Sequence, residues 1–131
     1  MPFDLDERFI VAAEEKLGAK LPYSYRQAMM KGNGGAVLAD GDVWHLYPIL
    51  DTSDRKRLKR SCSDILYETR CMRDWQGWPE NALAIASNGT SDQLVLLKEG
   101  RQYDPSVYVW LHDTGELVEV AEVFSDLERR L

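Results

Sequence analysis

Residues 83–98 of the chain, LAIASNGTSDQLVLLK, consist of two apolar runs separated by a polar stretch. The polar stretch, residues 87–93, clusters Ser, Asn, Gly, Thr and Asp, which are residue types that favour turns. The flanking runs, 83–87 and 94–98, have the length and the composition of short strands. The pattern therefore predicts two β-strands connected by a turn.

Two more segments, residues 107–112 and 117–121, continue this pattern toward the C-terminus as a β-meander. The residues between them, 113–115, are typical of a three-residue hairpin loop with a left-handed glycine. The segments 94–98 and 107–112 are apolar on both faces, so we expect them to be central strands covered by helices on at least one face. A capping box that starts at Ser125 predicts a short final helix.

Two short helices are predicted before the first strand. A capping box starting at Asp4 begins the first helix, which Gly18 stops, and a second box starting at Ser24 begins a helix that ends near Lys31. The glycine-rich stretch 32–35 then has two interpretations, a helix C-cap and a phosphate-binding loop. No Lys-Ser or Lys-Thr follows it, which favours the C-cap.

The middle of the chain predicts one hairpin and one longer helix. Residues 36–47 have an extended pattern that turns at residues 40–42. Thr52 or Ser53 then caps a third helix, which we expect to continue to about Asp74. Glycine and proline in the segment that follows predict a loop.

The composition indicates one domain, over residues 1–131, because 131 residues with 44% hydrophobic side chains suffice for one core. No signal peptide or membrane span is recognisable, so we expect a cytoplasmic protein in which the glycosylation sequon at Asn88 is incidental. Cys62 and Cys71 lie too far apart on one predicted helix to pair. No metal-ligand spacing occurs, so we expect reduced thiols and neither metal nor cofactor.

Charge is distributed unevenly along the chain, whose formal net charge is -6. Five of the six residues 55–60 are basic, which leaves 11 basic against 22 acidic residues elsewhere. We interpret this basic cluster as a solvated helix face, because the acidic remainder would repel nucleic acid. The acidic remainder suits a basic protein partner, and we expect neither nucleic acid nor a membrane to bind. The oligomeric state stays open.

The residues that could carry catalysis lack the partners that catalysis needs. No Gly-x-Ser-x-Gly element frames a serine, and His45 and His112 alternate with apolar neighbours as strand residues do. A hydrolase that uses Asp92 with His112 is therefore the weakest of the functional hypotheses. We expect a protein that is not an enzyme, and we assign no catalytic residue.

Loops and strand ends carry the side chains that we predict to form a partner surface. The tryptophans of the loop 75–78 have two interpretations, as exposed anchors for a protein partner or as aromatics that cover the end of the third helix. Asp92 either holds its turn or reaches outward. The candidate partner-binding residues are Asp40, Asp42, Trp44, Trp75, Trp78, Asp92 and Tyr103.

Five segments occur in an order that one family shares. They are Glu14-x-x-Leu17-Gly18-x-x-Leu21-Pro22-x-x-Tyr25-Arg26, then Gly32-Asn33-Gly34-Gly35, then Trp44-x-Leu46-x-Pro48, then Ile85-Ala86-Ser87-Asn88-Gly89, and finally Val109 to Asp113. Together they resemble the SUKH superfamily, which contains the fungal cell-wall assembly regulator and many bacterial toxin-immunity proteins. The Leu-Pro-x-x-Tyr and Asn-Gly-Gly motifs are the most specific part of this resemblance.

The resemblance implies an α+β fold, with a mainly antiparallel, curved sheet of about six strands and helices packed against it. It implies no catalytic activity. Bacterial members neutralise a toxin domain, of nuclease or deaminase class, by direct binding, and this is the leading hypothesis. A regulatory adaptor that binds a cellular protein is the alternative. One departure concerns the loop between the paired strands, where the family is richer in Gly and Asp and this chain has Thr90 and Ser91.

Overall fold

The computed structural model describes residues 2–130, so the two ends of the predicted domain, residues 1 and 131, lie outside the described residues. The described chain forms four α-helices, one 3₁₀ helix and eight strands. In chain order they are α1 (Glu7–Leu17), α2 (Tyr23–Lys31), β1 (Ala36–Ala39), β2 (Asp42–Leu46), α3 (Arg55–Ser61), α4 (Ile65–Met72), β3 (Ala82–Ser87), β4 (Gln93–Glu99), β5 (Gln102–Tyr103), β6 (Val107–Trp110), β7 (Leu117–Ala121), η1 (Phe124–Asp126) and β8 (Glu128–Arg130).

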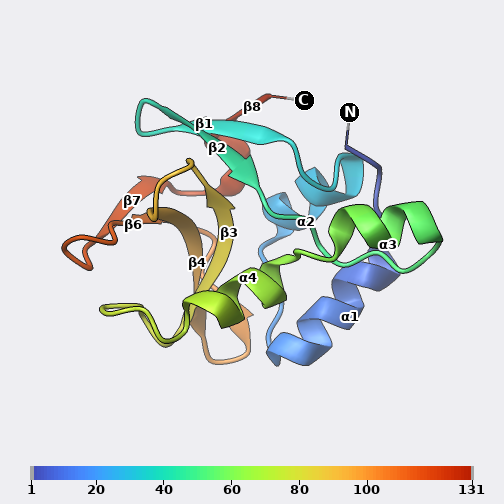
Figure 1. Ribbon diagram of the computed structural model, residues 1–131, viewed down its shortest axis with the longest axis horizontal. Coiled ribbons are helices and arrows are strands. Elements are labelled where there is room, and N and C mark those ends of the chain that lie inside the picture. Colours follow the sequence, from blue (N-terminus) through green and yellow to red (C-terminus); the bar gives the residue numbers. More distant parts are fainter. Residues whose placement is uncertain (1, 131) are drawn as a thin grey trace.

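The strands form one curled antiparallel sheet in the order β7-β6-β4-β3-β2-β1-β8, and β5 pairs with β4 beside this path. In Figure 1, α1, α2 and α3 lie together on the right, α4 crosses toward β3, and β6 and β7 lie on the left. The predicted α+β class with a curved antiparallel sheet is confirmed, although eight strands exceed the expected six or so.

The stretch 83–98 forms the antiparallel pair β3 and β4, in which Leu83 lies opposite Leu96 and Ser87 lies opposite Gln93. Leu94 and Leu96 point into the main core, which lies between this sheet and the helices. Val95 points the other way, into a smaller cluster with Trp110. The prediction that residues 94–98 form a central strand covered on at least one face is therefore confirmed, and Leu94 to Leu96 are buried on both faces.

The N-terminal half of β3 is not paired with β2, because the two strands meet only at Ser87 and Ala86. Helix α4 covers this open edge, and the Ala84 N–H donates to Thr69 Oγ1 over 2.8 Å. Both groups are buried. A threonine hydroxyl thus replaces the missing strand, which keeps the edge from exposing an unpaired donor.

Thr69→Val is expected to lower the free energy of unfolding by about 1–3 kcal/mol, because it leaves the buried Ala84 N–H without an acceptor at nearly constant volume. Thr69→Ser keeps the hydroxyl and serves as the control, with a smaller loss from one methyl group. Urea unfolding of the three proteins checks the prediction. Equal losses for the two variants would show that packing, and not the hydrogen bond, holds α4 on β3.

The third predicted helix is in fact two helices, so that prediction is wrong. Asp64 begins α4, since its carboxylate accepts from the N–H groups of Leu66 and Tyr67 over 2.8 and 2.9 Å. The Ile65 N–H donates to the carbonyl of Pro48 instead of to an earlier turn of the helix. Asp54, and not Thr52 or Ser53, caps α3 by accepting from the Arg57 N–H over 2.8 Å. Cys62 and Cys71 are free and exposed.

The two predicted N-terminal capping boxes are also wrong, although both helices end where expected. Asp6, not Asp4, caps α1 by accepting from Arg8 N over 2.9 Å, and Gly18 ends the helix at a φ of 68°. Helix α2 starts after Pro22, and Ser24 Oγ is buried without a hydrogen bond. A proline at the N-cap fixes the extended conformation that a capping side chain would otherwise stabilise.

The predicted final helix is wrong as well, because a single 3₁₀ turn leads into the edge strand β8, which pairs with β1. The cause is Arg129, whose guanidinium donates to the carbonyls of Ala28, Gly32 and Gly34. Burial lowers the pKa of Arg129 from its ordinary value. The carbonyls that end α2 thus obtain donors from β8. A local capping pattern cannot compete with three charge-assisted hydrogen bonds.

Candidate functional site

Four segments meet at one end of the sheet. Since His45 pairs with Ser87 and Gln93 pairs with Trp110, the β1–β2 turn, the β3–β4 loop and the β6–β7 turn all leave the sheet on the same side. The loop before β3 joins them, because Trp110 Nε1 donates to the Gly77 carbonyl over 3.1 Å. We call residues 40–42, 75–78, 88–92 and 112–116 the loop rim. These segments lie along the left of Figure 1.

Polar side chains connect the β3–β4 loop to the first hairpin. Asn88 Nδ2 donates to Asp42 Oδ2 over 2.8 Å. Asn88 Oδ1 accepts from the Thr90 N–H and hydroxyl over 3.0 and 2.6 Å, and Thr90 Oγ1 accepts from the Asp92 N–H over 3.1 Å. The asparagine of the sequon is therefore part of the loop's own hydrogen-bond network.

Asp92 connects the same loop to the β6–β7 turn. Its Oδ1 accepts from the His112 N–H over 3.0 Å and lies 2.6 Å from His112 Nδ1. The Asp92 side chain is 21% exposed and that of His112 is 44% exposed. Asp92 thus bridges two loops of the rim. In a hydrolase, a carboxylate of this kind orients the imidazole as the base that activates a nucleophile. Within residues 2–130, however, no Ser, Thr or Cys side chain forms a hydrogen bond with the His112 imidazole.

Asp92→Ala is expected to lower the free energy of unfolding by about 1 kcal/mol, because His112 loses an acceptor at a partly exposed site. Asp92→Asn is the matched control, since its amide oxygen still accepts from the His112 N–H. Thermal unfolding at neutral pH distinguishes the two. Full stability of the alanine variant would mean that Asp92 does not hold the rim together.

Three tryptophans stack on the outer face of the sheet. Trp110 is buried, Trp78 meets it edge to face with 4.9 Å between ring centroids, and Trp75 lies at 6.2 Å and is 40% exposed. Trp78 packs with the smaller cluster around Val95. The loop aromatics therefore cover Trp110 of β6, and Trp75 keeps enough exposed surface to contact a partner.

Two of the predicted partner-binding residues are corrected by the structure, because they are buried. Trp44 is 2% exposed, and its Nε1 donates to the Ala39 carbonyl over 2.9 Å. Tyr103 is 7% exposed, and burial raises its pKa to about 12. Strand alternation directs both side chains inward. Asp40, Asp42, Trp75, Trp78 and Asp92 lie together on the loop rim, and their partner-binding role stays a prediction.

The sequence did not lead us to predict the group of carboxylates at this end of the sheet. Residues 102–128 hold seven carboxylates and no Lys or Arg. Asp113 and Glu116 of this segment lie exposed on the rim, and Glu119 lies exposed on the adjacent β7. A count of charge by segment, instead of over the whole chain, would have found them.

The basic cluster on α3 faces the solvent as predicted, since Arg55, Lys56, Lys59 and Arg60 are exposed, and it also contacts the N-terminal segment. Arg57 pairs with Asp4 at 2.9 Å and with the buried Asp51 at 3.4 Å. The guanidinium carbons of Arg57 and Arg60 lie 4.6 and 4.7 Å from the centroid of the Phe3 ring. The cluster therefore holds the N-terminal segment against α3 through ion pairs and cation–π contacts.

The residues that carry the family resemblance serve the fold. Glu14 Oε2 accepts from the Leu21 N–H over 2.7 Å and pairs with Arg26 at 3.2 Å. The Asn33 side chain exchanges two hydrogen bonds of 2.8 Å with the backbone of Ile49. These motifs therefore identify the architecture, and a binding specificity has to come from other positions.

Fold and site together define an α+β domain with a curled antiparallel sheet, helices on one side, and an acidic, aromatic loop rim at one end. The family model of the SMI1 / KNR4 family (SUKH-1) matches residues 4–130, so the chain belongs to this family and the resemblance is confirmed. A search of curated proteins gave no match.

In residues 2–130 no helix is long and apolar enough to cross a membrane, and no three His, Cys, Asp or Glu side chains are grouped as a metal site.

Proposed function

We propose that this chain is a cytoplasmic, non-catalytic immunity protein that neutralises a toxin domain of nuclease or deaminase class by binding it directly. The observation that carries the proposal is the loop rim, which holds both exposed carboxylates and the exposed Trp75. Enzymes that act on nucleic acids present basic grooves to phosphate, and an acidic surface of a protein is complementary to such a groove. An exposed tryptophan is the side-chain type that most often anchors such an interface.

The separation of charge supports the same proposal. The basic helix α3 and the acidic strand β7 lie at opposite ends of the long axis of the molecule (Figure 1). A basic partner is therefore attracted to one end and repelled by the other, which orients the encounter before contact. Complementary potentials of this kind raise association rates and make binding sensitive to salt.

Co-expression with the toxin domain encoded beside this chain tests the proposal. We expect the chain to restore growth of the host and to copurify with the toxin as one tight complex. A toxin that stays free and active, or a locus without any toxin gene, would contradict it. A regulatory adaptor of the same family would instead bring down several cellular proteins from its native cell, and the same pull-down separates these two functions.

A further inference from the structure

Strand β7 is an open edge of the sheet. It stands last in the strand order and pairs, within the described residues, with β6 alone. The Leu111 N–H donates to the Glu116 carbonyl over 2.9 Å. Bonding directions alternate along an antiparallel strand. The backbone N–H and C=O groups of Val118 therefore point toward β6, whereas those of Leu117 and Glu119 point away from the sheet. In Figure 1, β7 bounds the sheet on the left, beside the loop rim.

The side chains of β7 expose apolar surface on both faces of the strand and protect its edge with negative charge alone. Leu117 and Val118 are 37% and 40% exposed, and they lie on opposite faces of the strand. Proteins commonly protect such an edge with charged side chains, above all lysine, with proline or with a covering element. The segment 116–122 has neither lysine nor proline, and its only charged residues are three glutamates.

The spacing of these glutamates selects what can pair with the edge. Glu119 lies on β7, and Glu116 and Glu122 lie just before and just after the strand, three positions to either side of Glu119. If two copies of β7 paired antiparallel about this centre, Glu119 would face Glu119, and Glu116 would face Glu122. Like charges directly opposite each other destabilise a strand pair, whereas opposite charges stabilise it. The edge therefore disfavours a second copy of this chain and favours a basic strand.

We propose that the β7 edge is a strand-addition site for an extended basic segment of the protein partner. The inference rests on the proposed function, because the toxin domain would supply the segment. The added strand bonds to the outward N–H and C=O groups of Leu117 and Glu119, and it places Lys or Arg opposite the three glutamates. Main-chain hydrogen bonds provide affinity in this mode and side chains provide specificity. Basic residues at every third position are thus the expected signature.

Two synthetic nine-residue peptides test the edge with the full chain. One carries Lys at positions 2, 5 and 8 among Val and Thr residues, and the other has the same composition with its three lysines consecutive. We expect the spaced peptide to bind about tenfold more tightly, because only it pairs each lysine with a glutamate. Equal affinities, measured by fluorescence anisotropy, would overturn the proposal, since simple charge attraction does not depend on spacing.

Substitutions at Leu117 separate the backbone contribution from the side-chain contribution. Leu117→Pro removes one outward N–H, a change that edge strands tolerate, and Leu117→Ala keeps it. We expect the proline variant to bind the spaced peptide about tenfold more weakly than the alanine variant does. Equal binding would overturn the proposal. If Leu117→Pro fails to fold, the variant with Glu116→Lys, Glu119→Lys and Glu122→Lys decides instead, because it should prefer a spaced peptide with Glu in place of Lys.

The toxin domain itself distinguishes this inference from the proposed function. If Leu117→Pro and Leu117→Ala bind the toxin domain equally well, the edge inference fails and the immunity function stands. If no variant binds the toxin domain but the spaced peptide still requires the Leu117 N–H, the immunity function fails and the strand-addition site stands.

Discussion

Replacing Arg129 by leucine is expected to lower the free energy of unfolding by about 3–5 kcal/mol, the largest loss that we predict for one side chain. The guanidinium donates to the carbonyls of Ala28, Gly32 and Gly34 at the end of α2. Leucine leaves these carbonyls without a charged donor in a half-buried site, and it releases β8 from α2. Urea unfolding followed by tryptophan fluorescence measures the change.

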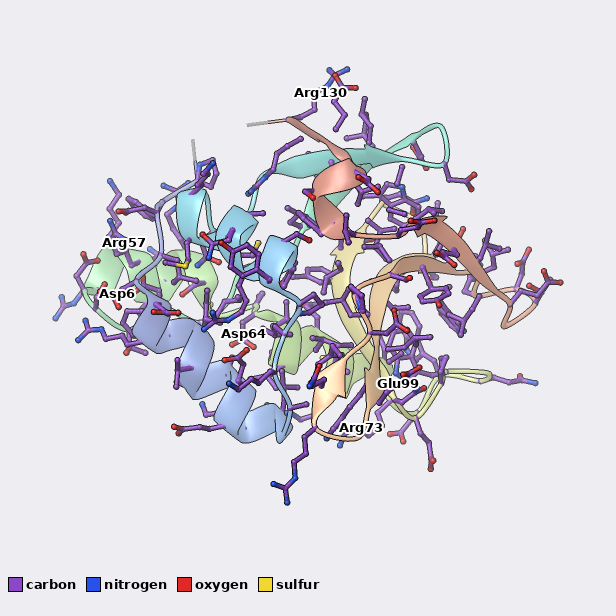
Figure 2. All side chains as sticks on the ribbon, turned by 180° about the vertical axis from the view of Figure 1, so that it is seen from behind. Asp6, Arg57, Asp64, Arg73, Glu99 and Arg130 are labelled. Carbon is purple, nitrogen blue, oxygen red and sulfur yellow. The ribbon has the colours of Figure 1, made fainter. Side chains whose placement is uncertain are left out.

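Arg130 provides the matched control, because it lies on the same strand and is exposed (Figure 2). Arg130→Leu removes the same charge and is expected to change the free energy of unfolding by less than about 0.5 kcal/mol. Arg129→Lys should lower the free energy of unfolding by an amount between these two losses, because an ammonium group keeps the charge but lacks the planar arrangement of donors of a guanidinium group. Similar losses at both arginines would show that net charge, and not the cap of α2, is what matters.

Reversing charge on the loop rim is expected to weaken binding of the toxin domain by about a hundredfold or more, which is the largest effect on function. Asp113→Lys and Glu116→Lys together change the charge where the rim and β7 meet. Both carboxylates are exposed and form no side-chain hydrogen bond within the described residues, so the fold should be unaffected. The same variant should lose much of the salt dependence of binding.

The control for this variant carries the same change of net charge elsewhere. Glu15→Lys with Glu99→Lys alters exposed residues of α1 and of the end of β4 that lies away from the rim. Calorimetric titration should give nearly the affinity of the unchanged protein. Equal weakening by both variants would mean that net charge, and not the rim, controls the complex.

The elements that the sequence predicted well are those with a strong local pattern. The apolar runs of β3 and β4 are short and bounded by turn residues, which indicates buried strands, and the structure buries both runs. The elements that the sequence predicted wrongly depend on contacts with residues far away along the chain. The bond from Ile65 N to the Pro48 carbonyl starts α4 anew, and Arg129 reaches carbonyls on α2 that lie far away along the chain.

The candidate site was predicted in part for the same reason. Asp42 and Asp92 follow from turn chemistry, and the structure brings their loops together. Whether a strand-end aromatic faces inward depends on sheet register, which is why Trp44 and Tyr103 were misplaced. Glu119 and the flanking Glu116 and Glu122 were visible in the sequence, but their meaning depends on β7 being the last strand of the sheet.

Hydrogen–deuterium exchange of the chain, alone and in complex with the toxin domain that we propose as its partner, tests the central claim most directly. The claim is that the partner covers the acidic end of the sheet. We predict that amides of residues 88–92 and 112–119 become protected in the complex, while those of α3 exchange at unchanged rates. Protection confined to α3 and the N-terminal segment, with the loop rim unchanged, would contradict the account.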